Sequence, residues 1–152
     1  MSAPKIITLN FFITIDASAE TVWHKMLDQD GYKIWTSAFD KSSYYQGSWD
    51  LDQEILFKSQ DNESGLAGAI TKNNYLKVVE ITYQSILNSE GLEDLSEQSK
   101  AMNGLVERYT FTNISESETK VEIYAETLES FSQYMSDQWP IALQKLKEIC
   151  EQ

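Results

Sequence analysis

Several residue types that carry catalysis or metal binding are scarce in this chain of 152 residues, which has one cysteine, one histidine and one arginine. Because Cys150 is alone, no intrachain disulfide can form, and a reducing, cytoplasmic setting is the simplest expectation. The single histidine, His24, excludes metal sites and catalytic schemes that need two, and no Gly-x-Ser-x-Gly element or Cys–His arrangement is present. We therefore expect no bound metal and no cofactor.

Positive charge is also scarce. The chain has 12 lysine and arginine residues against 24 aspartate and glutamate residues, and its formal net charge is −12. Nucleic-acid binding needs clustered basic residues that replace counterions, and anionic membrane surfaces attract the same clusters. No stretch approaches the roughly 20 apolar residues that cross a bilayer. The composition thus argues against a nucleic-acid partner and against membrane insertion.

Aromatic residues, by contrast, are plentiful. They make up 12% of the chain, and hydrophobic residues of all kinds make up 41%. Aromatic side chains suit strands, packed cores and ligand-lined cavities alike. The length is that of one domain, and the sequence has no internal repeat and no proline-rich linker. We expect a single domain over residues 1–152.

The first 36 residues predict a strand followed by helical segments. Residues 6–15 alternate between apolar and polar side chains, which is the period of a strand with one buried face. Ser18 is a good N-cap for a helix over about Ala19–Asp28. We expect Gly31 to end that helix and Tyr32–Thr36 to form one further short turn.

The middle of the chain predicts strands. Alternating segments bounded by turn residues indicate six of them, over residues 44–49, 54–58, 65–70, 75–86, 105–112 and 119–126. The polar residues 59–64 predict a hairpin loop. The acidic connection 88–104 has room for a short helix, and connections of this length are often functional or mobile.

A long amphipathic helix is predicted at the C-terminal end, over Phe131–Ile149. Its apolar residues recur at steps of three or four and form one stripe: Phe131, Met135, Trp139, Ala142, Leu146 and Ile149. Pro140 lacks a backbone donor, so we expect either a kink near Ser136–Trp139 or a restart of the helix at Pro140. The order of elements predicts an α+β domain with an antiparallel sheet and helices on one face.

Five segments carry a resemblance to a known family: IDASAETVW at 15–23, Tyr32 with Trp35, GSW at 47–49, ERYTF at 107–111 and WPIAL at 139–143. In their order and spacing they resemble the START-like superfamily (SRPBCC domains), and within it the homologues of a heat-shock ATPase activator. The resemblance covers Lys5 to Cys150. It implies the helix-grip fold, in which a curved antiparallel sheet wraps around a long C-terminal helix, with a short N-terminal helix pair and an apolar cavity between sheet and helix.

The candidate site is a set of side chains expected to converge between the sheet and the long helix. They are Trp35, Phe39, Tyr44, Trp49, Phe57, Tyr83, Glu107, Tyr109, Phe111, Phe131, Met135 and Trp139. They could fill the space as a solid core, or they could line the cavity that the resemblance implies; we favour the cavity. Tyrosine hydroxyls and one carboxylate would then supply the few polar groups that such a pocket uses.

Glu107 is the one carboxylate expected inside. Strand alternation places it on the same face as Tyr109 and Phe111, where burial would raise its pKa, whereas Arg108 should point to the opposite face. Glu107 is the sole weak candidate for catalysis, and a structural hydrogen bond is favoured over a catalytic role.

Three functions remain open at this stage. The favoured one is non-catalytic binding of a small hydrophobic or aromatic ligand. The alternatives are an enzyme of the polyketide cyclase or dehydratase kind, with Glu107 and a tyrosine as acid–base pair, and a chaperone-associated interaction protein. We expect a monomer or a weak homodimer, and the interaction role would add a protein partner.

Overall fold

The computed structural model describes residues 4–61 and 64–152. In chain order the elements are β1 Ile6–Ile15, α1 Ala19–Leu27, α2 Gln29–Thr36, β2 Ser43–Gly47, β3 Glu54–Ser59, β4 Gly65–Asn74, β5 Val78–Leu87, α3 Glu97–Met102, β6 Val106–Ser115, β7 Glu118–Leu128 and α4 Glu129–Cys150. The predicted loop between β3 and β4 includes residues 62–63, which lie outside the described residues.

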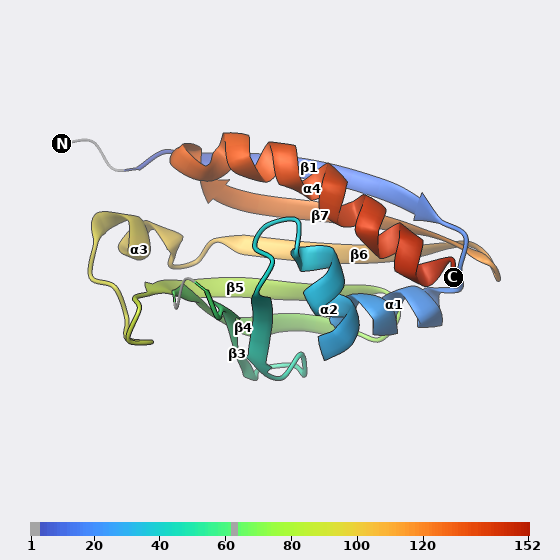
Figure 1. Ribbon diagram of the computed structural model, residues 1–152, viewed down its shortest axis with the longest axis horizontal. Coiled ribbons are helices and arrows are strands. Elements are labelled where there is room, and N and C mark those ends of the chain that lie inside the picture. The colour runs from blue at the N-terminus through green and yellow to red at the C-terminus, as the bar shows by residue number, and fades with distance from the viewer. Residues whose placement is uncertain (1–3, 62–63) are drawn as a thin grey trace.

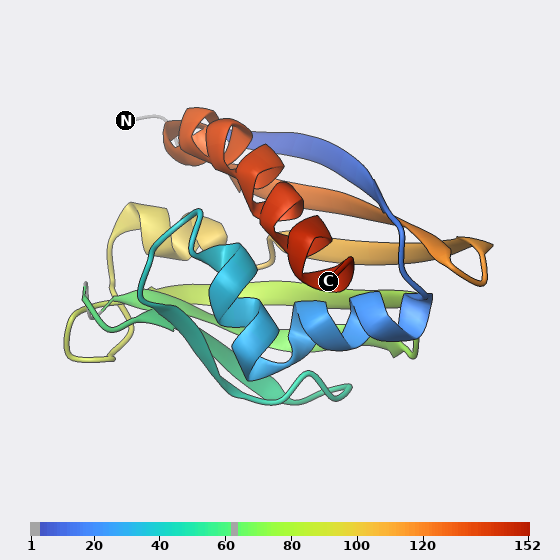
Figure 2. The ribbon, with the colours of Figure 1, turned by 45° about the vertical axis from the view of Figure 1, so that its right-hand side comes forward.

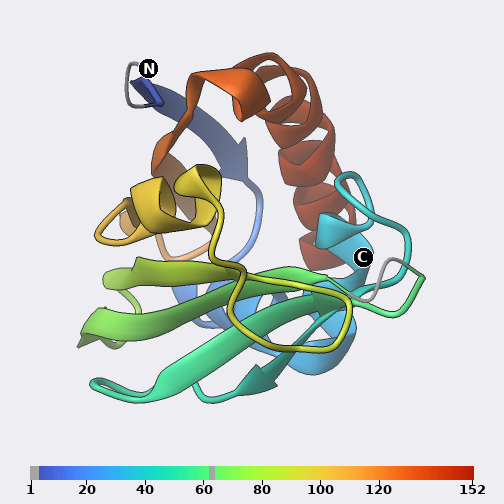
Figure 3. The same cartoon turned by 90° about the vertical axis from the view of Figure 1, so that its left-hand side faces the viewer.

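The strands form one seven-stranded sheet in the order β1-β7-β6-β5-β4-β3-β2, and every neighbouring pair is antiparallel. The sheet curves strongly when seen along its strands, and α1, α2 and α4 lie on its hollow side (Figure 3). Helix α4 crosses in front of β1 and β7 at one end of the sheet (Figure 1). The predicted α+β helix-grip fold is therefore confirmed.

The alternation in β1 decides which of its side chains face the helices. Burial alternates along the strand, and Phe11 and Ile13 pair with Ile123 and Val121 of β7. Phe11, Ile13 and Ile15 join the core or pack against it, while the alternate residues Thr8 and Asn10 are exposed. The predicted face of this strand is confirmed.

Helices α1 and α2 follow one another with a sharp break between them (Figure 2). The Ser18 side chain accepts a hydrogen bond from the Thr21 amide at 3.2 Å and caps α1, as predicted. The break falls at Asp28, whose backbone is extended, so the prediction that Gly31 ends the first helix is wrong. Gly31 lies inside α2, where a Cβ atom would come within 1.7 Å of the Lys25 carbonyl oxygen. The glycine lets the two helices approach, and it does not terminate either of them.

Helix α4 runs without interruption across Pro140, so the predicted alternative of a restart there is wrong. The kink stays a prediction. Burial along the stripe is uneven. Trp139 and the stripe residues that follow it, Ala142, Leu146 and Ile149, are buried, whereas Met135 is only partly buried and Phe131 is 39% exposed. The second half of α4 thus packs in the core, while its first turns do not.

The connection between β5 and β6 contains α3, as its length allowed. Ser96 caps this short helix by accepting a hydrogen bond from the Ser99 amide, and Met102 is buried against the core. None of the helices in residues 4–61 and 64–152 combines the length and apolar character that a membrane-spanning helix requires.

Candidate functional site

Aromatic rings from four different elements meet between the sheet and α4. The ring centroids of Trp35 and Trp139 lie 5.6 Å apart and stack, and the Tyr109 ring meets Trp139 edge-on at 6.1 Å. Tyr32 contacts Tyr45 edge-on at 5.0 Å. The Trp35 ring is held in place because its indole nitrogen donates to the Met26 carbonyl at 2.8 Å. Edge-on and offset contacts of this kind are the favoured geometries for aromatic rings.

The rings do not fill the space completely. One open pocket of about 190 Å³, called the inner chamber below, is lined by Tyr32, Trp35, Thr36, Phe39, Ser43, Phe57, Leu66, Tyr83, Glu107, Tyr109, Tyr134, Met135 and Trp139. An outer chamber of about 380 Å³ is lined by Ser64, Gly65, Leu66, Tyr83, Ile86, Met102, Glu107, Ala125, Glu126, Thr127, Phe131, Tyr134 and Met135. The two chambers adjoin, since five side chains line both: Leu66, Tyr83, Glu107, Tyr134 and Met135.

Glu107 lies at this junction and is held by two tyrosines. Its Oε2 atom accepts hydrogen bonds from the Tyr83 hydroxyl at 2.6 Å and from the Tyr109 hydroxyl at 3.2 Å. Burial raises the pKa of Glu107, and the two hydroxyl hydrogen bonds offset part of that rise. Its Oε1 atom accepts no hydrogen bond from any residue that the structure describes. The predicted burial of this carboxylate and its predicted hydrogen bonding are confirmed.

The surrounding tyrosines are held in their neutral form. Burial raises the pKa of Tyr83, Tyr109 and Tyr32 well above the usual tyrosine value, and the nearby Glu107 charge raises them further. These hydroxyls therefore remain hydrogen-bond donors at neutral pH. They are suited to binding a polar group and poorly suited to acting as bases.

Trp139, which lines the inner chamber, carries a second unpaired polar group. Its indole nitrogen is buried and meets no acceptor among residues 4–61 and 64–152. Glu107 Oε1 and the buried Trp139 indole nitrogen are thus two polar atoms that the described part of the chain leaves without partners. Unpaired groups of this kind are costly when buried and are satisfied by water or by a ligand.

Nine of the twelve predicted site residues line one chamber or both. They are Trp35, Phe39, Phe57, Tyr83, Glu107, Tyr109, Phe131, Met135 and Trp139. Their placement agrees with the predicted convergence between sheet and helix, while their role as ligand contacts stays a prediction.

The other three predicted residues line neither chamber. Tyr44 lies on the opposite face of β2, because it is Tyr45 that shares the inner face with its cross-strand partner Phe57. Trp49 packs behind the chamber wall, with its ring 6.3 Å from that of Tyr109. The ring of Phe111 packs 5.0 Å from that of Trp23, which belongs to α1.

Sequence reasoning missed Tyr32 and Tyr134, which line the inner chamber. Tyr32 precedes Trp35 by three residues on α2, and Tyr134 follows Phe131 by three residues on α4, so helical spacing could have found both. The Tyr134 hydroxyl donates to the Phe39 carbonyl, which links the first turns of α4 to the segment after α2.

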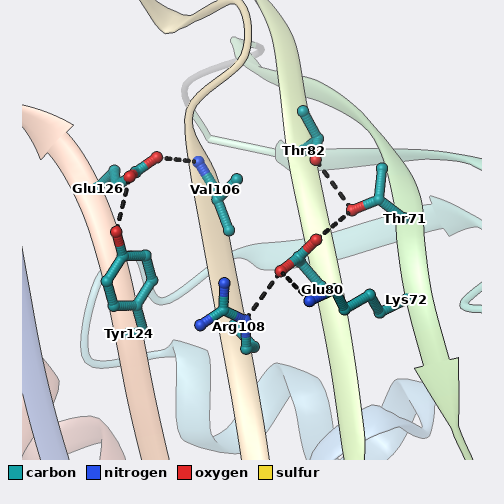
Figure 4. A network of polar contacts seen from close by, with 8 residues as sticks. All are labelled: Thr71, Lys72, Glu80, Thr82, Val106, Arg108, Tyr124 and Glu126. Atoms are coloured by element: carbon teal, nitrogen blue, oxygen red, sulfur yellow. Dashed lines mark hydrogen bonds and ion pairs between the residues drawn. The ribbon is translucent and has the colours of Figure 1, made fainter.

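A second group of charged side chains lies on the outer face of the sheet (Figure 4). The Arg108 Nε atom donates to Glu80 Oε2 at 2.8 Å, and the Thr71 hydroxyl donates to Glu80 Oε1 at the same distance. Burial alone would raise the pKa of Glu80, but the hydrogen bonds from Arg108 and Thr71, together with the Lys72 charge, outweigh it and lower that pKa. Arg108 points away from Glu107, as predicted, and the paired charges mark this cluster as structural.

Two further features bear on metal binding and on nucleophilic chemistry: the grouping of possible metal ligands and the state of the Cys150 thiol. Within the described residues, no three His, Cys, Asp or Glu side chains group closely enough to hold a metal ion. Burial raises the pKa of Cys150 to about 12, so its thiol is not a nucleophile at neutral pH.

Comparisons with known proteins support the fold of this chain and do not identify its activity. No protein-family model and no curated protein sequence matches this chain. Solved structures do match it. The Aha1 dimer structure from Colwellia psychrerythraea is 19% identical with a TM-score of 0.70, and the match covers 95% of this chain and 96% of that one. A protein from Mesorhizobium loti is 12% identical with a TM-score of 0.70, covering 93% and 95% of the two chains.

A third similar structure is DynU16, a protein of the dynemicin biosynthetic locus. It is 8% identical with a TM-score of 0.66, and the match covers 93% of this chain and 46% of that one. Identities this low establish the architecture and not the activity. The chain therefore shares its overall fold, the predicted helix-grip fold, with these solved structures.

Proposed function

We propose that this protein binds a small hydrophobic or aromatic molecule, without transforming it, in the inner and outer chambers. The observation that carries the proposal is the unfilled, ring-lined space between the sheet and α4, with Glu107 at the junction of its two parts. Ligand sites are typically apolar cavities of a few hundred Å³ with a small number of convergent polar groups. The chambers supply both features.

The first turns of α4 support the same proposal. A helix that only completed the core would bury its whole apolar stripe, yet Phe131 and Met135 line the outer chamber and stay partly exposed. Their side chains therefore border space that a ligand could occupy. Covering them with a bound molecule would bury further apolar surface, at roughly 25 cal/mol per Å².

An acid–base enzyme is the second candidate, and the short Tyr83–Glu107 contact of 2.6 Å is the observation that favours it. DynU16, from a biosynthetic locus, shares the fold at 8% identity. The raised pKa of Tyr83 keeps its hydroxyl protonated at neutral pH, so Glu107 and not Tyr83 would have to act as the base. Loss of Glu107 from such an enzyme should reduce turnover about 10²–10⁴-fold.

The chaperone-associated role has less support from the surface. Phe12, Leu92 and Leu95 are among the most exposed large apolar side chains; Leu92 and Leu95 lie in the connection between β5 and α3, whereas Phe12 belongs to β1. The Aha1 likeness is one of fold at 19% identity. The oligomeric state, expected to be a monomer or a weak homodimer, stays a prediction.

Binding of the neutral fluorescent probe N-phenyl-1-naphthylamine tests the favoured function. We expect the folded protein to bind it with micromolar affinity, about −8 kcal/mol, and apolar competitors to displace it. Met135→Trp should abolish this binding because Met135 lines both chambers, at an overpacking cost of about 1–3 kcal/mol.

Ile141→Trp is the matched control, because Ile141 lies on the same helix, is 49% exposed and lines neither chamber. The control should bind the probe like the parent. Native mass spectrometry of freshly purified protein should, in addition, detect a co-purified small molecule. If the parent binds no probe, or if both variants bind it equally, the binding function is wrong.

A further inference from the structure

Glu107 is a buried carboxylate without a cationic partner. No lysine, arginine or histidine lines either chamber among the described residues, and the Glu107 contacts are the two tyrosine hydroxyls at Oε2. Buried charges in proteins are normally paired, because an isolated ion loses its hydration. The second oxygen, Oε1, is therefore a position where a cationic hydrogen-bond donor would be strongly favoured.

The walls around this carboxylate are rich in electron-rich ring faces. Tyr32, Trp35, Tyr109 and Trp139 all line the inner chamber with Glu107. Aromatic faces attract cations through the ring quadrupole, and tryptophan and tyrosine do so best. A carboxylate that shares a pocket with such rings has the chemistry of an ammonium site.

The charge of the whole chain points the same way. A formal net charge of −12 raises the local concentration of cations and repels anions. A ligand carboxylate would bring a second negative charge into the same small chamber as Glu107. An anionic ligand is disfavoured on both counts.

We infer that the ligand is an organic cation that consists of an aromatic ring and a protonated alkylamine. Its ammonium group donates to Glu107 Oε1, while its ring packs among the aromatic walls of the inner chamber. This inference rests on the proposed binding function and specifies the chemical class of its ligand. It is independent of whether the ligand fills one chamber or extends into both.

Three probes with the same ring system and different charge test the inference. They are 1-naphthylmethylamine, which is a cation at neutral pH, 1-naphthalenemethanol, which is neutral, and 1-naphthoate, which is an anion. Isothermal titration of the full chain at neutral pH should give the tightest binding for the amine, on the order of ten- to hundredfold tighter than the alcohol. The anion should bind most weakly.

Glu107→Gln removes the proposed counter-charge with little change of shape. The amine should lose its advantage in this variant, while the alcohol should bind as it does to the parent. Glu122→Gln is the matched control. It removes the same charge, but Glu122 is exposed on β7 and lines neither chamber. The control should keep the preference for the amine.

The pH dependence of the parent protein gives a test that needs no variant. The amine should bind more tightly as pH rises and Glu107 ionises, up to the pH at which the amine itself loses its proton, while the alcohol should show no such rise. The tyrosines that line the inner chamber are Tyr32 of α2, Tyr83 of β5, Tyr109 of β6 and Tyr134 of α4, and each has a raised pKa. Glu126 of β7 borders the outer chamber but accepts hydrogen bonds from the Val106 amide and the Tyr124 hydroxyl.

The outcomes separate the inference from the function beneath it. If the alcohol or the naphthoate binds as tightly as the amine, the ligand is not a cation, yet the apolar binding function stands. If Glu107→Gln weakens the amine and the alcohol equally, Glu107 does not select charge and the inference is overturned. If no probe of any charge binds and N-phenyl-1-naphthylamine also fails, the binding function falls together with the inference.

Discussion

At the scale of single residues, Glu107 carries more of the chemistry than any other side chain. It is buried, it is shared by both chambers, and two tyrosine hydroxyls hold one of its oxygens. The tyrosines stay neutral because burial and the Glu107 charge raise their pKa values. The result is a fixed acceptor in an apolar cavity, which suits selective binding whether or not any reaction follows.

Glu107→Gln should change how the stability of the protein depends on pH. Burial holds the pKa of Glu107 above its usual value, so the folded state binds more protons than the unfolded chain between the two pKa values. Rising pH through that window therefore lowers the stability of the parent, and the loss persists at higher pH. Glutamine does not titrate, and its carbonyl oxygen can still accept from Tyr83 and Tyr109.

Urea unfolding at several pH values from 4 to 8 measures this effect. The stability of Glu107→Gln relative to the parent should rise with pH across the window above the ordinary carboxyl pKa. Glu122→Gln, which removes an exposed carboxylate, is the control for the general effect of charge. A stability difference between Glu107→Gln and the parent that stays constant over this pH range would contradict the prediction.

At the scale of elements, the packing of α1 against α2 depends on a single glycine. A Cβ atom at Gly31 would overlap the Lys25 carbonyl oxygen, and that neighbour is backbone and cannot rotate away. Helix α2 carries Tyr32 and Trp35 into the chamber wall, so its position matters for the site as well.

Gly31→Ala should therefore destabilise the fold, although alanine is the better helix former. We expect a loss of about 1–3 kcal/mol, as for overpacked cores, in urea unfolding monitored by circular dichroism. Lys33→Ala, on the exposed side of the same helix, should change stability by less than about 0.5 kcal/mol. Equal stabilities for Gly31→Ala and the parent would show that the helices can separate at no cost.

At the scale of the whole molecule, Trp139 of α4 contacts both the sheet and helix α2. Its ring contacts Phe11 of β1, Trp35 of α2 and Tyr109 of β6, as well as Phe39 in the segment after α2. It is 1% exposed, so one side chain of α4 connects the edge strand, the central sheet and the helical layer.

Trp139→Ala should destabilise the protein by about 3–5 kcal/mol, the range found when large aromatic side chains are removed from cores. Urea unfolding measures the loss, and Ile141→Ala on the exposed face of α4 serves as the reference. An unfolding midpoint that matches the parent would mean that Trp139 does not hold the helix on the sheet.

Much of the architecture could be predicted from the sequence, because the periods of burial are local. Alternation in residues 6–15 predicted the inner face of β1, and Ser18 marked the start of α1. The resemblance in segments such as ERYTF at 107–111 added the order of the layers. These signals depend on neighbours along the chain, which the sequence shows directly.

The errors arose where two solutions have the same local pattern. In the short strand β2 the adjacent tyrosines are equally good inward residues, and only pairing with Phe57 decides for Tyr45 over Tyr44. A glycine between two helical segments is equally compatible with a helix end and with a close contact between the helices. At Gly31 the close contact with the Lys25 backbone is what requires the glycine.

The sequence by itself determined the fold class, the periodicity of the elements and the position of one carboxylate among inward aromatic side chains. Only the tertiary structure decided that these side chains leave space between them. A solid core and a lined cavity require the same apolar stripe, and they differ in where the first turns of α4, with Phe131 and Met135, lie relative to the sheet. That position results from contacts between residues far apart in the chain, such as Tyr134 with the Phe39 carbonyl, which no local pattern encodes.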